Sequence, residues 1–430
     1  MRNLSTRLSS FALLVIFSLG TLTACPGGGA ENQLQADTGP VGETDVEADA
    51  EPDIDAQDPN IPAATLRVAT YNASLYRTSE GELAADLADD QSEQAQQVAE
   101  VIQRVRPDVI LINEFDWDAD GTSAGLFDQN YLSIGQNGAD PIEYPYFFIP
   151  TTNTGVHSGV DLNNDAEVVS TPGSDDYAQD AFGYGQFPGQ YGMVIYSKYP
   201  IVEDDVRTFQ TLLWKDMPDN LLPTDYYSAE AIEIFRLSSK NHVDAPIEID
   251  GHRLHILASH PTPPAFDGDE QRNVRRNNDE IRLVVDYLTA GDDAAYIQDD
   301  SGTEGGLQED AAFVIVGDLN NDPNDGGGFD DAIHALLDHT RVQDPKPTSV
   351  GAVEDSTQGA NRNHDGDPAL NTANFNDHTV GNLRVDYALP SSNTTVEDTG
   401  VFWPGSDEEY RDLRTASDHH MVWVEITLGR

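Results

Sequence analysis

The sequence predicts an α/β domain over residues 65–430, and three observations support that prediction. Residues 66–112 alternate strand, helix and strand patterns. A helical apolar pattern over 270–288 precedes another apolar run, 313–316, whose β-branched residues favour a buried strand. Polar residues follow several of these runs directly. The chain is long for one domain, but it contains no second linker and no internal repeat, so we expect one domain with long insertions.

The N-terminal segment has the pattern of a processing signal. Arg2 and Arg7 precede an apolar run, which ends in the sequence LTAC at Cys25. This pattern resembles the lipobox of bacterial lipoproteins, where cleavage before the cysteine leaves a lipid on Cys25. We therefore expect residues 1–24 to be a signal peptide and Cys25 to anchor the protein to a membrane at the cell envelope. An ordinary secretory signal with a chance cysteine is the less favoured alternative.

Cys25 is the only cysteine of the 430 residues. An intramolecular disulfide, a thiolate metal site and a cysteine nucleophile are therefore excluded, and a catalytic metal would need oxygen and imidazole ligands. Residues 31–64 are rich in Asp and Glu and contain no Lys or Arg. Such a composition cannot bury enough apolar surface to fold, so we expect residues 25–64 to form a disordered acidic tether.

The formal net charge of −53 is extreme. An acidic excess of this size keeps a protein hydrated and soluble, and it is typical of proteins made for high salt. It also repels polyanions at low salt, which makes duplex nucleic acid an unfavourable partner. Duplex nucleic acid is not excluded, because high salt screens the repulsion.

Two strands and a helix open the domain. Leu66–Tyr71 has strand composition and is followed at once by Asn72, which taken alone would be a turn former. Residues 91–106 have helical apolar spacing, and a proline ends this helix before the strand 109–112. Glu114 stands at the exit of that strand, where a charge needs a partner or a metal.

Three segments rich in Gly, Asp, Asn and Pro lack clean periodicity, and we expect them to be loop insertions. They span residues near 115–190, 208–245 and 342–382. Asp161, Asn163 and Asp165 have the one-three-five spacing of a calcium loop, and residues 361–367 approach that motif more closely. Both lack the closing acid. A polar loop is favoured at the first segment, and structural Ca²⁺ stays an open alternative in both.

Two hairpins are predicted in the centre of the chain. Residues 191–197 form the first arm of one, which turns before residues 200–201. The turn of the other is Asp250-Gly251, the strongest short hairpin signal. His260 follows the second hairpin, and the prolines after it cannot continue a ladder. A lone histidine at such a place would ordinarily be a hydrogen-bonded surface group.

The first half of the helix at 270–288 concentrates positive charge in a chain that is poor in it. It carries Arg272, Arg275 and Arg276. Guanidinium groups suit phosphate or carboxylate, so these arginines are candidates for binding a substrate phosphate. Ion pairs with neighbouring acids are an equally weighted alternative.

A carboxylate and an amide follow the end of the apolar run 313–316. Gly317 stops the strand, and Asp318 and Asn320 follow two positions apart. An ionised carboxylate can accept a proton from water, and an amide beside it can donate to an oxyanion. Ligands of α/β sheets collect at such strand ends. An Asx-rich turn is the alternative for this pair taken alone.

The last strands carry three more candidates. Asp386 lies inside the strand pattern 383–389, where a carboxylate must be paired or neutralised. Asp418 and His419 open the final strand. Together with the earlier strand ends, these acids, imidazoles and amides match what phosphate-ester hydrolysis requires: metal ligands, an oriented water and donors for developing charge.

Seven short motifs stand in one order along the chain: ATYNA, INE, YSKYPI, SH at His260, GDLNNDP, RVDY and SDHH. In these motifs the chain resembles the endonuclease/exonuclease/phosphatase superfamily, with its deoxyribonuclease I-like fold, across nearly all of residues 66–428. The resemblance implies two packed mixed β-sheets flanked by helices, a four-layer α/β sandwich. It also implies a divalent metal, usually Mg²⁺ with Mn²⁺ as the substitute, and inversion at phosphorus by an activated water.

The resemblance assigns a role to each metal and water residue. Glu114 would be the principal metal ligand, with Asn72 and Asp418 close to the metal. Asp318 would orient or deprotonate the attacking water, and Asn320 would hold that water or the phosphate.

The remaining implied roles concern the phosphate oxygens. His260 and His419 would donate to them, and Asp386 would pair with His419, fixing its tautomer and favouring the imidazolium. The segment HPTPPAFDG and the arginine-rich helix depart from a generic nuclease and leave the substrate open.

Three functions compete on this evidence. The favoured one is an extracellular, lipid-anchored, metal-dependent phosphohydrolase that acts on phosphomonoesters or small phosphodiesters as a monomer. A secreted nuclease is the alternative, disfavoured because a duplex-binding face should be basic. A binding protein built on an inactive enzyme fold is the weakest, because every matching position holds a competent residue.

Overall fold

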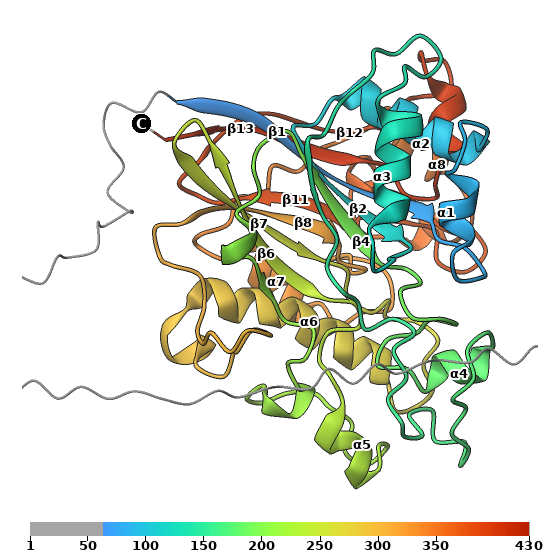
Figure 1. Ribbon diagram of the computed structural model, residues 1–430, viewed down its shortest axis with the longest axis vertical. Helices are drawn as coiled ribbons and strands as arrows, with labels where there is room; N and C mark the ends of the chain where they lie inside the picture. The colour runs from blue at the N-terminus through green and yellow to red at the C-terminus, as the bar shows by residue number, and fades with distance from the viewer. Residues whose placement is uncertain (1–62, 430) are drawn as a thin grey trace, which may run out of the picture. The chain divides into compact units, whose positions relative to one another are not determined.

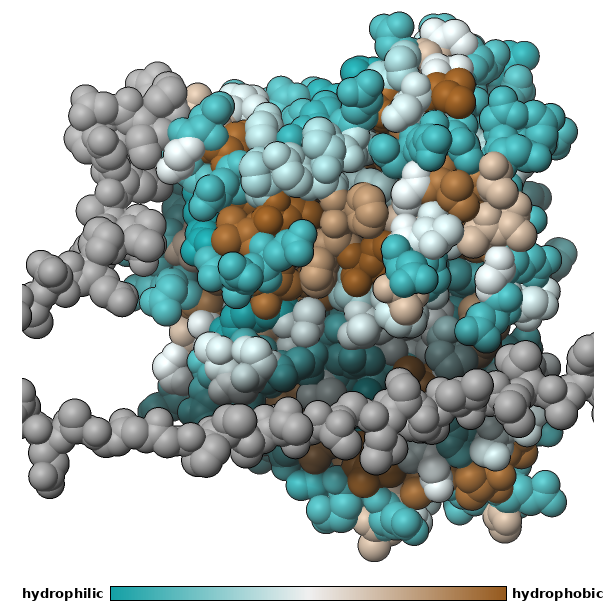
Figure 2. Space-filling view, viewed as in Figure 1, coloured by the Kyte–Doolittle hydropathy of each residue, from teal (hydrophilic) through white to brown (hydrophobic). Residues whose placement is uncertain are grey.

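The computed structural model describes residues 63–429 (Figure 1). The predicted signal peptide, Cys25 and all but the last two residues of the predicted tether lie outside the described residues. Ala64 already belongs to the first strand. In the described part of the chain, no helix has both the length and the apolar character needed to cross a membrane. Hydrophilic residues predominate on the face drawn in Figure 2, and hydrophobic ones form separate patches.

The strands form two large sheets and one small one. The six-stranded sheet has the order β12 (Thr395–Val401), β13 (Val422–Leu428), β1 (Ala64–Leu75), β2 (Val109–Phe115), β4 (Met193–Ser197) and β3 (Tyr146–Phe148). The five-stranded sheet has the order β11 (Asp386–Pro390), β8 (Ala312–Asp318), β7 (His252–Ser259), β6 (His242–Ile249) and β5 (Arg207–Thr208). The small sheet pairs β10 (Asn382–Leu383) with β9 (Ala373–Asn374). Parallel pairing occurs between β1 and β2 and between β7 and β8, so both large sheets are mixed.

Helices cover the outer faces of the two large sheets (Figure 1). The α-helices are α1 (Glu82–Asp86), α2 (Glu93–Val105), α3 (Thr122–Phe127), α4 (Asp175–Gln179), α5 (Ala229–Ile234), α6 (Arg272–Thr289), α7 (Asp331–Leu337) and α8 (Val350–Asp355). The apolar face of α2 packs on the six-stranded sheet, and α6 and α7 pack on the five-stranded one. The predicted four-layer α/β sandwich is confirmed.

The alternation of side chains explains why the central strands are apolar on both faces. In β8, Phe313 and Ile315 face the helices α6 and α7, while Val314 and Val316 face the other sheet. Residues of β1, β2, β4 and β13 meet residues of β6, β7, β8 and β11 in that inter-sheet core. Since successive side chains of a strand point to opposite faces, a strand between two cores needs an unbroken apolar run.

The structure corrects two local predictions and confirms a third. No hairpin follows β4, because Ile201 bridges Ile247 of the other sheet, so the chain crosses between sheets there. The predicted strand 383–389 is divided, because β10 ends at Leu383 and, after two intervening residues, Asp386 begins β11. Asp250 and Gly251 do form the turn between β6 and β7, with φ values of 50° and 88°, as a two-residue hairpin turn requires.

Candidate active site

The polar strand ends predicted from the sequence converge at one place. Glu114, Asp318, Asp418, His260 and His419 all line a single cavity. Asn320 lines it too, while Asn72 and Asp386 lie one contact behind, bonded to Asp318 and His419 respectively. The ends of β1, β2 and β8 meet there, since Asn72 Nδ2 donates to Asp318 Oδ2 and Asp318 N donates to Asn113 Oδ1.

Asp318 is the centre of this group. Its Oδ2 accepts a hydrogen bond from Asn72 Nδ2 at 3.1 Å and lies 3.6 Å from His260 Nε2 and 3.7 Å from His419 Nε2. Its Oδ1 accepts from the backbone N–H of Asn320 at 2.9 Å. Burial raises the pKa of Asp318 to about 7, although the charge of His419 opposes the rise. The carboxyl can therefore exchange a proton close to neutral pH.

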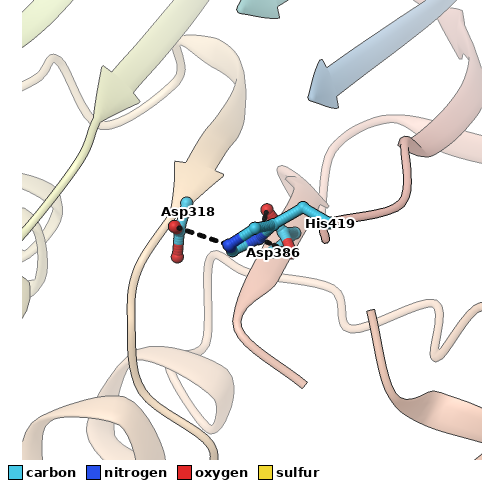
Figure 3. A group of neighbouring side chains, drawn as sticks. All are labelled: Asp318, Asp386 and His419. Atoms are coloured by element: carbon cyan, nitrogen blue, oxygen red, sulfur yellow. Dashed lines mark hydrogen bonds and ion pairs between the residues drawn. The ribbon is translucent and has the colours of Figure 1, made fainter. Parts of the chain in front are cut away.

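His419 lies between two carboxylates, one on each side of its ring (Figure 3). Its Nδ1 is 2.9 Å from Asp386 Oδ2, which also accepts from Thr372 Oγ1 at 2.8 Å. Burial alone would lower the pKa of His419, but the charges of Asp386 and Asp318 outweigh it and hold the pKa well above its ordinary value. His419 is thus an imidazolium, and Asp386 fixes its orientation.

His260 is in the opposite protonation state. Burial lowers its pKa well below the ordinary value, and the nearby charges of Lys240 and His419 add to the effect. A neutral imidazole on one side of Asp318 therefore faces an imidazolium on the other. Two like groups whose surroundings separate their pKa values are suited to different tasks at one pH.

Asn72, Glu114 and Asp418 form the second half of the site. The β1–β2 register is irregular between Asn72 and Leu75, and Glu114 has a φ of 56°, which is strained for a glutamate. Burial raises the pKa of Glu114, opposed by His419 and a hydrogen bond from Asn72, and the charge of Asp418 raises it further.

This donor set fits a divalent cation. Carboxylate and amide oxygens are the ligands that Mg²⁺ and Mn²⁺ prefer, and a cation would relieve the repulsion between Glu114 and Asp418. Asp318, Asp386 and His419 also have ligand-type atoms within 4.8 Å of one another and could bind a metal ion. Both sets of side chains therefore offer ligands for a cation, and the assignment of the metal to Glu114, Asn72 and Asp418 stays a prediction.

Lys240 is a site residue that sequence reasoning missed. It is buried, lines the cavity beside Asp318, and its Nζ donates to Pro261 O at 3.4 Å. Burial lowers its pKa, while the charges of Glu280, Asp318 and Glu114 oppose that shift. The only sequence signal was a cation just before a strand in a chain poor in cations.

The three arginines of α6 bind the protein itself. Arg276 donates to three backbone carbonyls, of Leu237, Phe182 and Arg236. Arg272 donates to Tyr226 Oη, Leu162 O and Gln179 Oε1, and Arg275 donates to Glu270 O. Backbone carbonyls accept most of these hydrogen bonds, and the ion pairs weighed as the alternative are represented by Arg272 Nε and Glu270 Oε1 at 3.8 Å. Arg272 and Arg276 also line the cavity, and their contact with a substrate phosphate stays a prediction.

The first calcium-like segment forms a polar loop. Asp161 accepts from the backbone N–H groups of Asn164 and Ala166, and Asn163 Nδ2 donates to Asp165. In residues 361–367, Asp365 N and Gly366 N donate to the carboxylate of Asp325. Bound Ca²⁺ in either segment stays a prediction.

Comparison with known proteins identifies the family of this chain. The sequence model of the Endonuclease/Exonuclease/phosphatase family matches residues 69–419. The chain belongs to the endonuclease/exonuclease/phosphatase family. It is a phosphoesterase of that family, and the matched range includes every candidate catalytic and metal residue.

Solved structures similar to this chain have low sequence identity to it. An endonuclease/exonuclease/phosphatase from Beutenbergia cavernae is 17% identical, with 85% of this chain and 72% of that chain covered and a TM-score of 0.45. Sphingomyelinase C from Streptomyces griseocarneus is 18% identical, with 84% and 99% covered and a TM-score of 0.42. A family protein from Leptotrichia buccalis is 14% identical, with 84% and 99% covered and a TM-score of 0.42. No curated protein matches the chain.

Proposed function

We propose that this protein is a divalent-metal-dependent phosphohydrolase that cleaves phosphomonoesters or small phosphodiesters. The supporting observation is Asp318, a buried carboxyl with a pKa of about 7 that is held between two imidazoles in different protonation states. In this proposal Asp318 takes a proton from the attacking water. The water oxygen bonds to phosphorus as the ester P–O bond breaks, and the departing alkoxide leaves as the alcohol after taking a proton from solvent, to which Asp318 in turn releases its own.

The other residues bind and orient. Asn320 holds the water or the phosphate, and neutral His260 and cationic His419 donate hydrogen bonds to phosphate oxygens. Lys240 adds a buried positive charge beside them. Glu114, Asn72 and Asp418 would hold Mg²⁺ or Mn²⁺, which when bound stabilises negative charge on the phosphate as a Lewis acid.

We further propose that the protein works at the cell envelope as a lipoprotein anchored to a membrane through Cys25, with residues 25–64 as a tether. The LTAC sequence and the acidic composition of that segment support this location. Metabolic labelling with a fatty acid, compared between wild type and Cys25→Ala, tests it. Equal label in both proteins would contradict the anchor.

The test of the activity is Mg²⁺-dependent phosphate release from a panel of small esters, with and without EDTA, at low and at molar salt. We expect activity on small esters to exceed activity on duplex DNA and to persist at molar salt. A nuclease that grips six or more backbone phosphates would lose about 10³-fold or more in affinity over a modest rise in salt. Salt-sensitive DNA degradation together with inert small esters would establish the nuclease instead.

A further inference from the structure

The cavity at the active site is larger than a phosphate group needs. Its volume is about 600 Å³, within the range of about 300–1,000 Å³ that is usual for pockets holding small organic molecules. The catalytic side chains form only part of its lining. The remaining walls come largely from the loop insertions, through residues such as Leu162, Gln179 and Tyr227. The alcohol part of the substrate is therefore the group these walls surround.

Several aromatic rings form part of the cavity lining. Tyr76 and Tyr191 lie with ring centroids 4.6 Å apart, and Phe375 contacts His419 edge-on at 5.3 Å. Tyr184 and Phe266 are exposed members of the lining, and Phe266 is 90% exposed with a φ of 61°. The ring of Phe266 leaves most of its apolar surface in water, and a ligand ring packed against it would bury that surface.

Two buried hydroxyls in the same lining have no hydrogen-bond partner. They belong to Ser239 and Thr262, whose residues are 4% and 7% exposed. Their positions are fixed by Glu280 of α6, whose two carboxylate oxygens accept from Ser239 N and Thr262 N, each at 2.6 Å. A buried hydroxyl without a partner costs about 1–3 kcal/mol, so a ligand that bonds to both would recover that cost.

We infer that the substrate is a small phosphate ester whose organic part is a planar ring with polar substituents, such as a nucleoside phosphate. This inference rests on the proposed phosphohydrolase function. A planar ring packs against the aromatic side chains, and its heteroatoms bond to Ser239 and Thr262. An alkyl chain would leave both hydroxyls unpaired.

The test compares nucleoside monophosphates with glycerol phosphate, using full-length protein in saturating Mg²⁺. Three variants alter the wall: Phe266→Ala, Thr262→Val and Ser239→Ala. Tyr146→Ala, on the exposed edge strand β3 outside the cavity, is the matched control for losing an exposed ring. Thermal unfolding is measured for each variant. Thr262→Val and Ser239→Ala remove no hydrogen bond of the free protein, so a purely structural role predicts unchanged kinetics.

We expect Phe266→Ala to raise the ratio of KM for the nucleotide to KM for glycerol phosphate about fivefold or more, which corresponds to the loss of one stacking contact. Thr262→Val and Ser239→Ala should each raise that ratio about threefold or more. Tyr146→Ala should change neither substrate. Equal effects on both substrates, or glycerol phosphate turned over as well as nucleotides, would overturn the ring assignment alone. Failure of every small ester to react would overturn the proposed function and the inference with it.

Discussion

Replacing Asp386 by Asn tests the imidazolium of His419 most directly. The change keeps the shape of the side chain, and Asn Oδ1 can still accept from Thr372, but the negative charge 2.9 Å from His419 Nδ1 is lost. At an effective dielectric constant of about 20, two charges at this distance attract by roughly 6 kcal/mol, an upper bound for the effect. Mutational experience with charged hydrogen bonds gives about 1.5–3 kcal/mol.

A loss of about 1.5–3 kcal/mol corresponds to a roughly 10- to 100-fold fall in kcat. The loss should appear in kcat because the imidazolium would stabilise negative charge that is greatest in the transition state. The assay is steady-state hydrolysis of a small phosphate ester in Mg²⁺, with thermal unfolding measured in parallel. Asp299→Asn is the matched control. Asp299 is also a buried acid, and its Oδ2 lies 2.7 Å from Arg207 Nε, outside the active-site cavity. That control should lose stability while keeping kcat.

Two results would refute the reasoning about Asp386. One is a kcat within about twofold of wild type in a folded Asp386→Asn protein, since even the weakest charged hydrogen bond predicts more. The other is a loss of kcat in the Asp299→Asn control as large as in the Asp386 variant. In that case the effect would report general destabilisation and not the charge on His419.

Three further predictions concern the metal, the wall of the site and pH. Glu114→Gln should weaken Mg²⁺ binding by about tenfold or more, measured by titrating activity with Mg²⁺, and undiminished affinity would remove Glu114 from the cation site. Glu280→Gln should lower the free energy of unfolding by about 1–3 kcal/mol and should also lower kcat, because the amide group turns a donor toward Ser239 N or Thr262 N. An unaffected kcat would show that the two hydrogen bonds of Glu280 do not position the site. Burial lowers the pKa of His242, so the folded state resists its protonation and stability falls as pH drops below about 6.5. The stability of His242→Gln should therefore fall by up to about 1.4 kcal/mol less than that of wild type for each pH unit below that value. Identical profiles of stability against pH for the two proteins would contradict the assignment to His242.

The sequence by itself determined which residues could take part in the chemistry, because the ends of strands can be predicted from it. An apolar run that stops at a glycine or before a polar residue marks both the core and the residue delivered to its edge, as at Asp318 and Glu114. The two-residue turn at Asp250-Gly251 was predictable for the same local reason, since its φ values are a property of those residues. The order of seven such motifs was enough to indicate the family.

Only the tertiary structure decided what surrounds those residues. Lys240 enters the site from a loop insertion, and nothing local distinguishes a buried lysine from a solvated one. Arg272 and Arg276 of α6 donate to backbone carbonyls of distant segments, which no spacing along the helix can reveal. The raised pKa of Asp318 and the lowered pKa of His260 follow from burial, modified by charges on other segments of the chain, such as that of His419. Burial and long-range charge exist only once the chain has folded, which is why they lay beyond the sequence.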